Sequence, residues 1–98
     1  MNYNSTFFNI LYSINIEFKQ RKYRIISKTK IENNSIEQSY IYTHPYNETF
    51  QYIITILNST KIKTSIPINK SNILYITYHN SIENVLNYII VHLNNIIM

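Results

Sequence analysis

Apolar and polar residues alternate along much of the chain, and this spacing predicts five β-strands. The strands are expected at residues 10–18, 23–31, 36–43, 61–68 and 73–78. Successive side chains of a strand point to opposite faces of a sheet, so a period of two indicates a strand with one buried face. Short polar segments separate the strands and are typical of hairpin connections, which favours an antiparallel sheet.

Three features of these segments predict how the strands are placed and joined. Pro67 has no N–H to donate to a neighbouring strand, so we expect the segment 61–68 at a sheet edge. The segment 73–78 is almost wholly apolar, which is typical of a strand at the centre of a sheet. The turn after the second strand contains Asn33 and Asn34, and asparagine adopts a positive φ more readily than other non-glycine residues.

Two further segments have the spacing of helices. We expect one helix over residues 47–58, beginning at Asn47, which is a good N-terminal cap. Its apolar stripe consists of Phe50, Ile53, Ile54 and Leu57. The second helix is expected to begin at Asn80, with Glu83 completing a capping box, and to continue to the end of the chain. Its apolar stripe consists of Ile82, Val85, Leu86, Ile89, Ile90, Leu93, Ile96 and Ile97.

These elements predict a single small α+β domain that spans residues 1–98, with the element order β-β-β-α-β-β-α. An antiparallel sheet of about five strands would carry the two helices packed on one face, because every apolar strand face then has a partner. The order of elements alone indicates no function, since the same order occurs in unrelated settings.

The composition is that of a protein from an AT-rich genome, such as a viral or organellar one. Glycine, alanine, aspartate, cysteine and tryptophan are all absent from the 98 residues, and the abundant residues are those with AT-rich codons. Without cysteine the chain can form neither a disulfide nor a cysteine-based zinc site. The same codon bias favours lysine over aspartate, so the net charge of +4 is weak support for an acidic partner.

Residues with catalytic chemistry are scarce, and we expect that the protein is not an enzyme. A phosphate-binding glycine loop is impossible without glycine, and a cysteine nucleophile is excluded. His44, His79 and His92 are dispersed without the short spacing of metal ligands. We therefore expect no catalytic residues, no metal, no cofactor and no small-molecule substrate.

The second strand and its approach are rich in basic residues. With two lysines of the fourth strand they form a candidate nucleic-acid-binding surface, because such a face attracts phosphate and nearby tyrosine rings can stack on bases. The candidate residues are Lys19, Arg21, Lys22, Arg24, Lys28, Lys30, Lys61 and Lys63. The alternative is an ordinary solvated strand, in which lysines protect a sheet edge against aggregation.

The ten tyrosines indicate a contact surface of another kind, because tyrosine is enriched at protein interfaces. Not all of them fit into one small core, and several flank the predicted helical stripes. The candidate interface residues are Tyr40, Tyr42, Tyr52, Ile56, Tyr88 and Val91. The leading hypothesis is therefore a non-enzymatic protein–protein interaction module, acting as a homodimer or as a subunit of a larger assembly. The alternatives are a ribosomal-protein-like nucleic-acid-binding component and a viral or mobile-element inhibitor of a host factor.

The chain contains no apolar run long enough to predict a membrane span. Its first residues lack the basic and apolar regions of a secretory signal peptide. With the absence of cysteine, these observations favour an intracellular location.

Overall fold

A computed structural model describes residues 5–67 and 74–95 of the chain. In these residues five strands form one antiparallel sheet, and two helices accompany it. The elements are α1 (Ser5–Gln20), β1 (Arg24–Glu32), β2 (Ser35–His44), β3 (Asn47–Asn58), β4 (Lys61–Pro67), β5 (Leu74–His79) and α2 (Ile82–Asn95). The predicted α+β class is confirmed, but the predicted order is wrong, because the chain begins with a helix and all five strands follow it.

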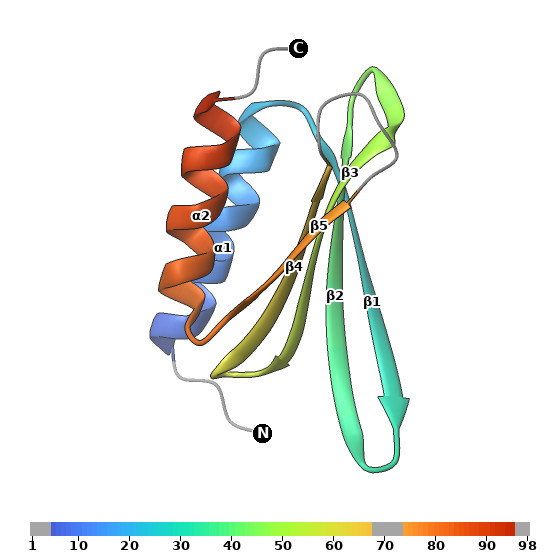
Figure 1. Ribbon diagram of the computed structural model, residues 1–98, viewed down its shortest axis with the longest axis vertical. Coiled ribbons are helices and arrows are strands. Elements are labelled where there is room, and N and C mark those ends of the chain that lie inside the picture. Colours follow the sequence, from blue (N-terminus) through green and yellow to red (C-terminus); the bar gives the residue numbers. More distant parts are fainter. Residues whose placement is uncertain (1–4, 68–73, 96–98) are drawn as a thin grey trace.

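The sheet is a simple meander in which each strand pairs with the next, in the order β1-β2-β3-β4-β5. Figure 1 shows α1 and α2 side by side on one face of this sheet, while no described element lies over the other face. Helix α1 contacts β1, and α2 contacts β4 and β5. We call the face without helices the open face.

The first element is a helix rather than the predicted strand at residues 10–18. The buried residues of α1 are Phe7, Leu11, Ile14 and Phe18, which are four, three and four positions apart. That spacing follows the helical repeat of 3.6, whereas the predicted strand face included Tyr12, which is exposed. The helix also buries Phe7, which lies before the predicted strand at residues 10–18.

The segment 47–58 is strand β3 rather than the predicted helix. Its buried residues include Phe50, Tyr52, Ile54 and Ile56, which have a period of two. The predicted helical stripe shares Phe50 and Ile54 with this set, because a spacing of four fits both periods. Tyrosine, isoleucine and threonine dominate the segment, and aromatic and β-branched side chains favour strands.

The predicted places of the last two strands are reversed. Strand β4 lies inside the sheet and pairs with both β3 and β5, whereas β5 is an edge strand. Pro67 is tolerated because it is the last residue of β4. The predicted residues 68, 73, 96 and 97 and the turn at 69–72 lie outside the described residues.

Residues with positive φ end the first helix and form the first hairpin turn. Lys22 has φ 65° and takes the place that glycine usually occupies after a helix. The Tyr23 amide donates to the carbonyl of Phe18 and the Lys22 amide to that of Lys19, which is the Schellman arrangement. Asn33 and Asn34 have φ values of 49° and 65° in the two-residue turn between β1 and β2, as expected for asparagine there.

The cap of α2 differs by one residue from the prediction. The hydroxyl of Ser81 accepts a hydrogen bond from the Asn84 amide at 3.2 Å, so Ser81 is the N-cap. Asn80 lies one residue earlier, and its side-chain oxygen accepts a hydrogen bond from the Asn84 side chain at 2.8 Å. The cap fixes where the helix begins beside β5.

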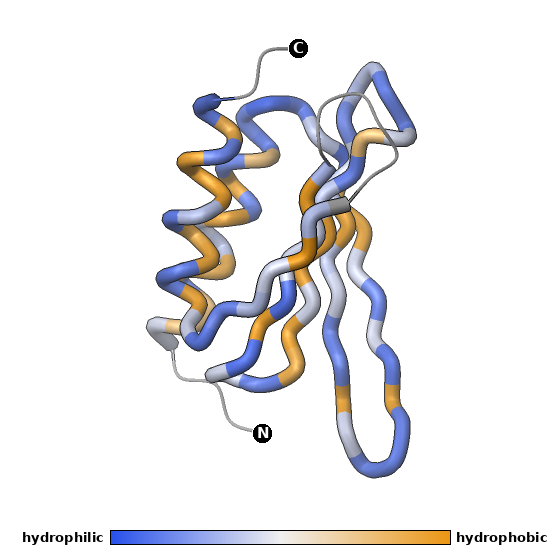
Figure 2. The backbone as a smooth tube through the Cα atoms, in the orientation of Figure 1, coloured by the Kyte–Doolittle hydropathy of each residue, from blue (hydrophilic) through white to orange (hydrophobic). Residues whose placement is uncertain are grey.

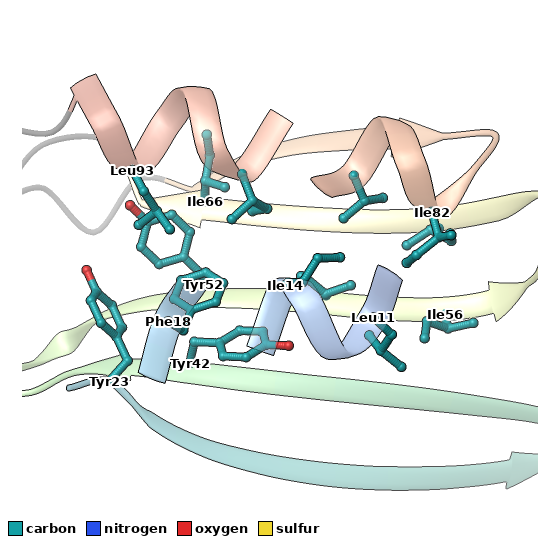
Figure 3. Packing of buried hydrophobic residues seen from close by; sticks show 14 of the residues in the cluster. Leu11, Ile14, Phe18, Tyr23, Tyr42, Tyr52, Ile56, Ile66, Ile82 and Leu93 are labelled. Atoms are coloured by element: carbon teal, nitrogen blue, oxygen red, sulfur yellow. The ribbon is translucent and has the colours of Figure 1, made fainter. Parts of the chain in front are cut away.

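The core lies between the helices and the sheet and is rich in aromatic rings (Figure 3). The rings of Phe18 and Tyr42 stack with their centroids 4.0 Å apart, and Tyr52 lies 5.2 Å from Phe18. The Tyr42 hydroxyl donates to Asn15, and the Tyr52 hydroxyl is 2.9 Å from Nδ1 of His92. Burial of these two phenols raises their pKa values well above the ordinary range.

Candidate interaction surfaces

The strand register places a row of isoleucines across the open face. Because Tyr42, Tyr52 and other buried residues face the helices, their alternate neighbours face the other way. The residues that oppose one another across the five strands are Ile26, Ile41, Ile53, Ser65 and Ile76. We call this set the isoleucine row. Its two ends are half exposed, at 50% for Ile26 and 55% for Ile76.

A second row with lysines runs beside the isoleucine row. Its residues are Lys28, Ser39, Thr55, Lys63 and Tyr78, one from each strand in order. The hydroxyls of Ser39 and Thr55 are hydrogen bonded at 3.1 Å in the middle of this lysine row. The ammonium group of Lys61 lies 5.7 Å from the centre of the Tyr78 ring, at the distance of a cation–π contact.

The predicted nucleic-acid-binding residues are divided between two places. By strand alternation Arg24, Lys28, Lys30, Lys61 and Lys63 lie on the open face. The remaining residues, Lys19, Arg21 and Lys22, lie at the end of α1 and in its cap. Arg21 is used there structurally, because its guanidinium donates to the Glu17 carbonyl at 2.8 Å and to Asn94 at 3.1 Å.

Two of the open-face cations have acidic neighbours. Lys30 is 3.0 Å from the Glu32 carboxylate, and this hydrogen bond raises the pKa of Lys30. Arg24 is 3.7 Å from the Glu48 carboxylate. Both pairs are exposed to solvent, where ion pairs contribute little to stability. Lys28 and Lys63 have no ion pair with any of the residues that the structure describes.

Three of the predicted interface residues belong to the core instead. Tyr42 and Tyr52 are fully buried and Ile56 is 2% exposed, because all three face the helices. They cannot contact a partner in the folded chain, and the prediction is wrong for them. Tyr40 is partly buried beside a hollow, whereas Tyr88 is partly buried and Val91 is 60% exposed on α2.

The edge strand β5 and the neighbouring flank of α2 expose side chains that are themselves uncharged. Tyr75, Ile76 and Tyr78 of β5 are all more than half exposed. The hydroxyl of Tyr88 on α2 lies 3.3 Å from the Thr77 hydroxyl, which joins the helix flank to the strand. We call the set Tyr75, Ile76, Tyr78, Tyr88 and Val91 the β5 edge surface.

A hollow at the start of α1 offers little chemistry. It has a volume of about 630 Å³ and lies between the start of α1 and the ends of β2 and β3. No lysine, arginine, glutamate or histidine lines it. The side-chain oxygen of Gln38 already accepts a hydrogen bond from Thr29, and that of Asn58 accepts from Thr60. Its lining therefore suits neither acid–base chemistry nor an ionic ligand.

His79 and His92 make hydrogen bonds and ring contacts that hold α2 against the sheet. His79 lies 3.0 Å from the Thr64 hydroxyl and 4.9 Å from the Tyr88 ring, and His92 is bonded to Tyr52. Burial lowers the pKa of both imidazoles, since the charged form is the more costly one to desolvate. The described part of the chain contains no group of three potential metal ligands.

Comparisons with known protein families, curated proteins and solved structures give no match to this chain. None of the described helices is long and apolar enough to span a membrane.

The strand residues of the β5 edge surface were not predicted, because a continuous apolar strand usually indicates a central one, whereas Tyr88 and Val91 were among the predicted interface residues. One signal for it is in the sequence. The segment 74–79 contains no lysine, arginine or glutamate, whereas 24–32 contains Arg24, Lys28, Lys30 and Glu32. A contrast of this kind between the first and last strands of a meander indicates that only one edge is protected.

Proposed function

We propose that this protein is a non-enzymatic interaction module that forms a homodimer through the β5 edge surface. The observation that carries the proposal is the difference between the two edges of the sheet. Both edge strands present unpaired backbone groups, which can pair with a strand of another chain. On β1 this tendency is countered by charged side chains, and on β5 no charged side chain opposes it.

The geometry of β5 suits pairing with a second copy of itself. Two β5 strands related by a twofold axis run antiparallel, so each strand offers the same surface to the other. Pairing in this way would extend the two sheets into one and bring the two α2 flanks together. Tyr88 and Val91 would then contribute to the contact, and tyrosine is favoured in such positions.

The distribution of charge also favours contact at β5 rather than at β1. Arg24, Lys28 and Lys30 would remain at the outer edges of the dimer, as far apart as the sheet allows. Joining two copies at β1 would instead bring these cations together, and like charges opposite each other are destabilising.

The test is the molar mass in solution, measured by light scattering after size-exclusion chromatography. We expect a dimer for the unchanged chain and a monomer for Ile76→Lys, because an edge lysine opposes strand pairing. Ile26→Lys is the matched control, since Ile26 lies in the same row at the other edge with a similar exposure. A monomeric unchanged chain, or dissociation by Ile26→Lys alone, contradicts the proposal.

Nucleic-acid binding is the alternative, and the cations of the open face support it. Charge reversal at Arg24 and Lys28 should then abolish binding to mixed single- and double-stranded nucleic acid, and the affinity should fall steeply with salt. Binding that survives the two reversals would exclude this alternative. It is the weaker candidate because Lys19, Arg21 and Lys22 lie at the end of α1, outside the strands that form this face.

A further inference from the structure

We propose that the open face is a second docking site and receives an acidic amphipathic helix of a partner protein. The site consists of the isoleucine row with the cations on either side of it. It shares Ile76 with the β5 edge surface, but its centre is on β2 and β3 rather than at β5. The proposal therefore stands or falls independently of the dimer.

The isoleucine row has the dimensions of a short helical contact. It crosses all five strands, which are spaced about 4.8 Å apart, so it is about 19 Å long. At 1.5 Å per residue, a helix of about 13 residues covers this length. Ile41 and Ile53 lie at the centre of the row and are only partly buried by their own sheet. An apolar helix stripe can remove the remaining surface from water.

Cations lie on both sides of the isoleucine row. Lys28 and Lys63 lie in the lysine row on one side, three strand spacings or about 14 Å apart. Arg24 lies on the other side, two residues before Ile26, in an exposed ion pair with Glu48 for which a glutamate of the partner would compete. An amphipathic helix carries its polar residues on both sides of the apolar stripe. Glutamates in those positions would meet the cations while the stripe covers the isoleucines.

The charge of the face argues against a second copy of this chain as the occupant. If two open faces stacked on a twofold axis, each lysine row would lie against another positively charged face. Like charges brought together across an interface reduce affinity, whereas complementary charges favour it and set the register. Ser39 and Thr55 between the lysines carry no negative charge, and the carboxylates that strand alternation places on this face, Glu32 and Glu37, lie beside Lys30 at its hairpin end.

The apolar centre also argues against nucleic acid. Proteins that bind single strands place aromatic rings where bases stack, in a groove that is basic along its length. On the open face the exposed aromatic residue is Tyr78 at the edge, and its ring is already contacted by Lys61. The centre of the face carries aliphatic side chains, which match apolar protein side chains better than phosphate.

A designed peptide can test the proposal directly. The probe is an 18-residue peptide of leucine and glutamate, with leucines at helical spacing along one stripe. We expect saturable binding by titration calorimetry, with an affinity that falls as salt is added. The controls are the same peptide with every glutamate replaced by lysine, and a single-stranded oligothymidylate. Equal binding of the lysine peptide, binding of the oligonucleotide alone, or no binding of any probe overturns the proposal.

Variants of the protein locate the contact. Lys28→Glu with Lys63→Glu should weaken binding of the acidic peptide by about tenfold or more, because complementary pairs become repulsive. Ile41→Thr should have a similar effect while keeping a β-branched residue in the strand. Tyr75→Lys, which targets the dimer from the opposite face of β5, should retain most of the peptide affinity. Unchanged binding by the two charge reversals, with circular dichroism showing a folded chain, also overturns the proposal.

Discussion

At the scale of single residues, the absence of glycine has a measurable effect on the first helix cap. Lys22 holds φ 65°, a conformation that costs a residue with a Cβ atom roughly 1–2 kcal/mol. We expect Lys22→Gly to raise the free energy of unfolding by about 1 kcal/mol, because glycine adopts this conformation without strain. The measurement is urea unfolding followed by circular dichroism.

Lys19→Gly is the control for this prediction. Lys19 lies one turn earlier, inside α1, where glycine lowers stability by roughly 0.5–1 kcal/mol relative to alanine. The two substitutions should therefore have opposite signs. A loss of stability in both variants would contradict the prediction. It would mean that the contacts of the Lys22 side chain stabilise the folded chain by more than the backbone strain at Lys22 destabilises it.

The buried imidazoles predict how stability changes with pH. Burial lowers the pKa of His79 and His92 below the ordinary value of 6.5. As the pH falls through that value, the unfolded chain takes up protons that the folded chain does not, so the folded state loses stability. We expect the melting temperature to fall between about pH 7.5 and about pH 5. His79→Asn with His92→Gln should make the dependence shallower, and an unchanged slope would contradict the prediction.

At the scale of elements, α1 and β3 show where sequence reasoning fails and why. A spacing of four residues belongs to both the helical and the strand period, so Ile14 and Phe18 fit either element, as do Phe50 and Ile54. The other positions decide. Phe7 lies outside the predicted strand at residues 10–18, and Tyr52 lies beside the apolar stripe of the predicted helix at residues 47–58. Alternation was reliable in β1 and β2, where polar side chains separate the apolar ones.

The candidate surfaces were also only partly predictable. Alternation was enough to place Arg24, Lys28 and Lys30 on one strand face, but Lys22, which the same alternation predicts beside them, lies in the cap of α1. The isoleucine row could not be predicted, because it depends on the register of β3 with both neighbours, and the spacing in this segment predicts a helix. The same error made Tyr52 and Ile56 appear to be surface residues. Candidate site residues whose position depends on the alternation of one strand were therefore predicted better than those whose position depends on how several strands pair.

The first hairpin differs from the rest of the sheet in a way that hydrogen exchange can detect. Figure 1 shows it projecting beyond the helices, and Figure 2 shows that its distal half is mostly hydrophilic. Residues 29–36 are exposed throughout, whereas Tyr52, Ile54 and Ile56 are buried. We expect the amides of this distal half to exchange at least about a hundredfold faster than those of Tyr52–Ile56. Similar rates would indicate that the hairpin is covered in solution.

At the scale of the whole molecule, the helices protect one face of the sheet and leave three regions to be explained. These regions are the open face, the β1 edge and the β5 edge. Lysines and an arginine are exposed to solvent on the open face and at the β1 edge. On the open face they lie beside the isoleucine row. Of the two edge strands that the structure describes, β5 exposes large side chains without any charged residue, whereas β1 has four charged residues among its exposed side chains. The meander therefore concentrates the tendency to self-associate at one end of the sheet.

Self-association at that edge predicts that thermal stability depends on protein concentration. A dimer that forms only from folded chains stabilises the folded state by mass action, so the melting temperature should rise with concentration. Calorimetric scans over an about hundredfold range of protein concentration would measure this rise in melting temperature. Ile76→Lys should melt at one temperature throughout the range, whereas Ile26→Lys should keep the dependence. A melting temperature of the unchanged chain that does not vary with concentration would mean that the β5 edge is not paired in solution.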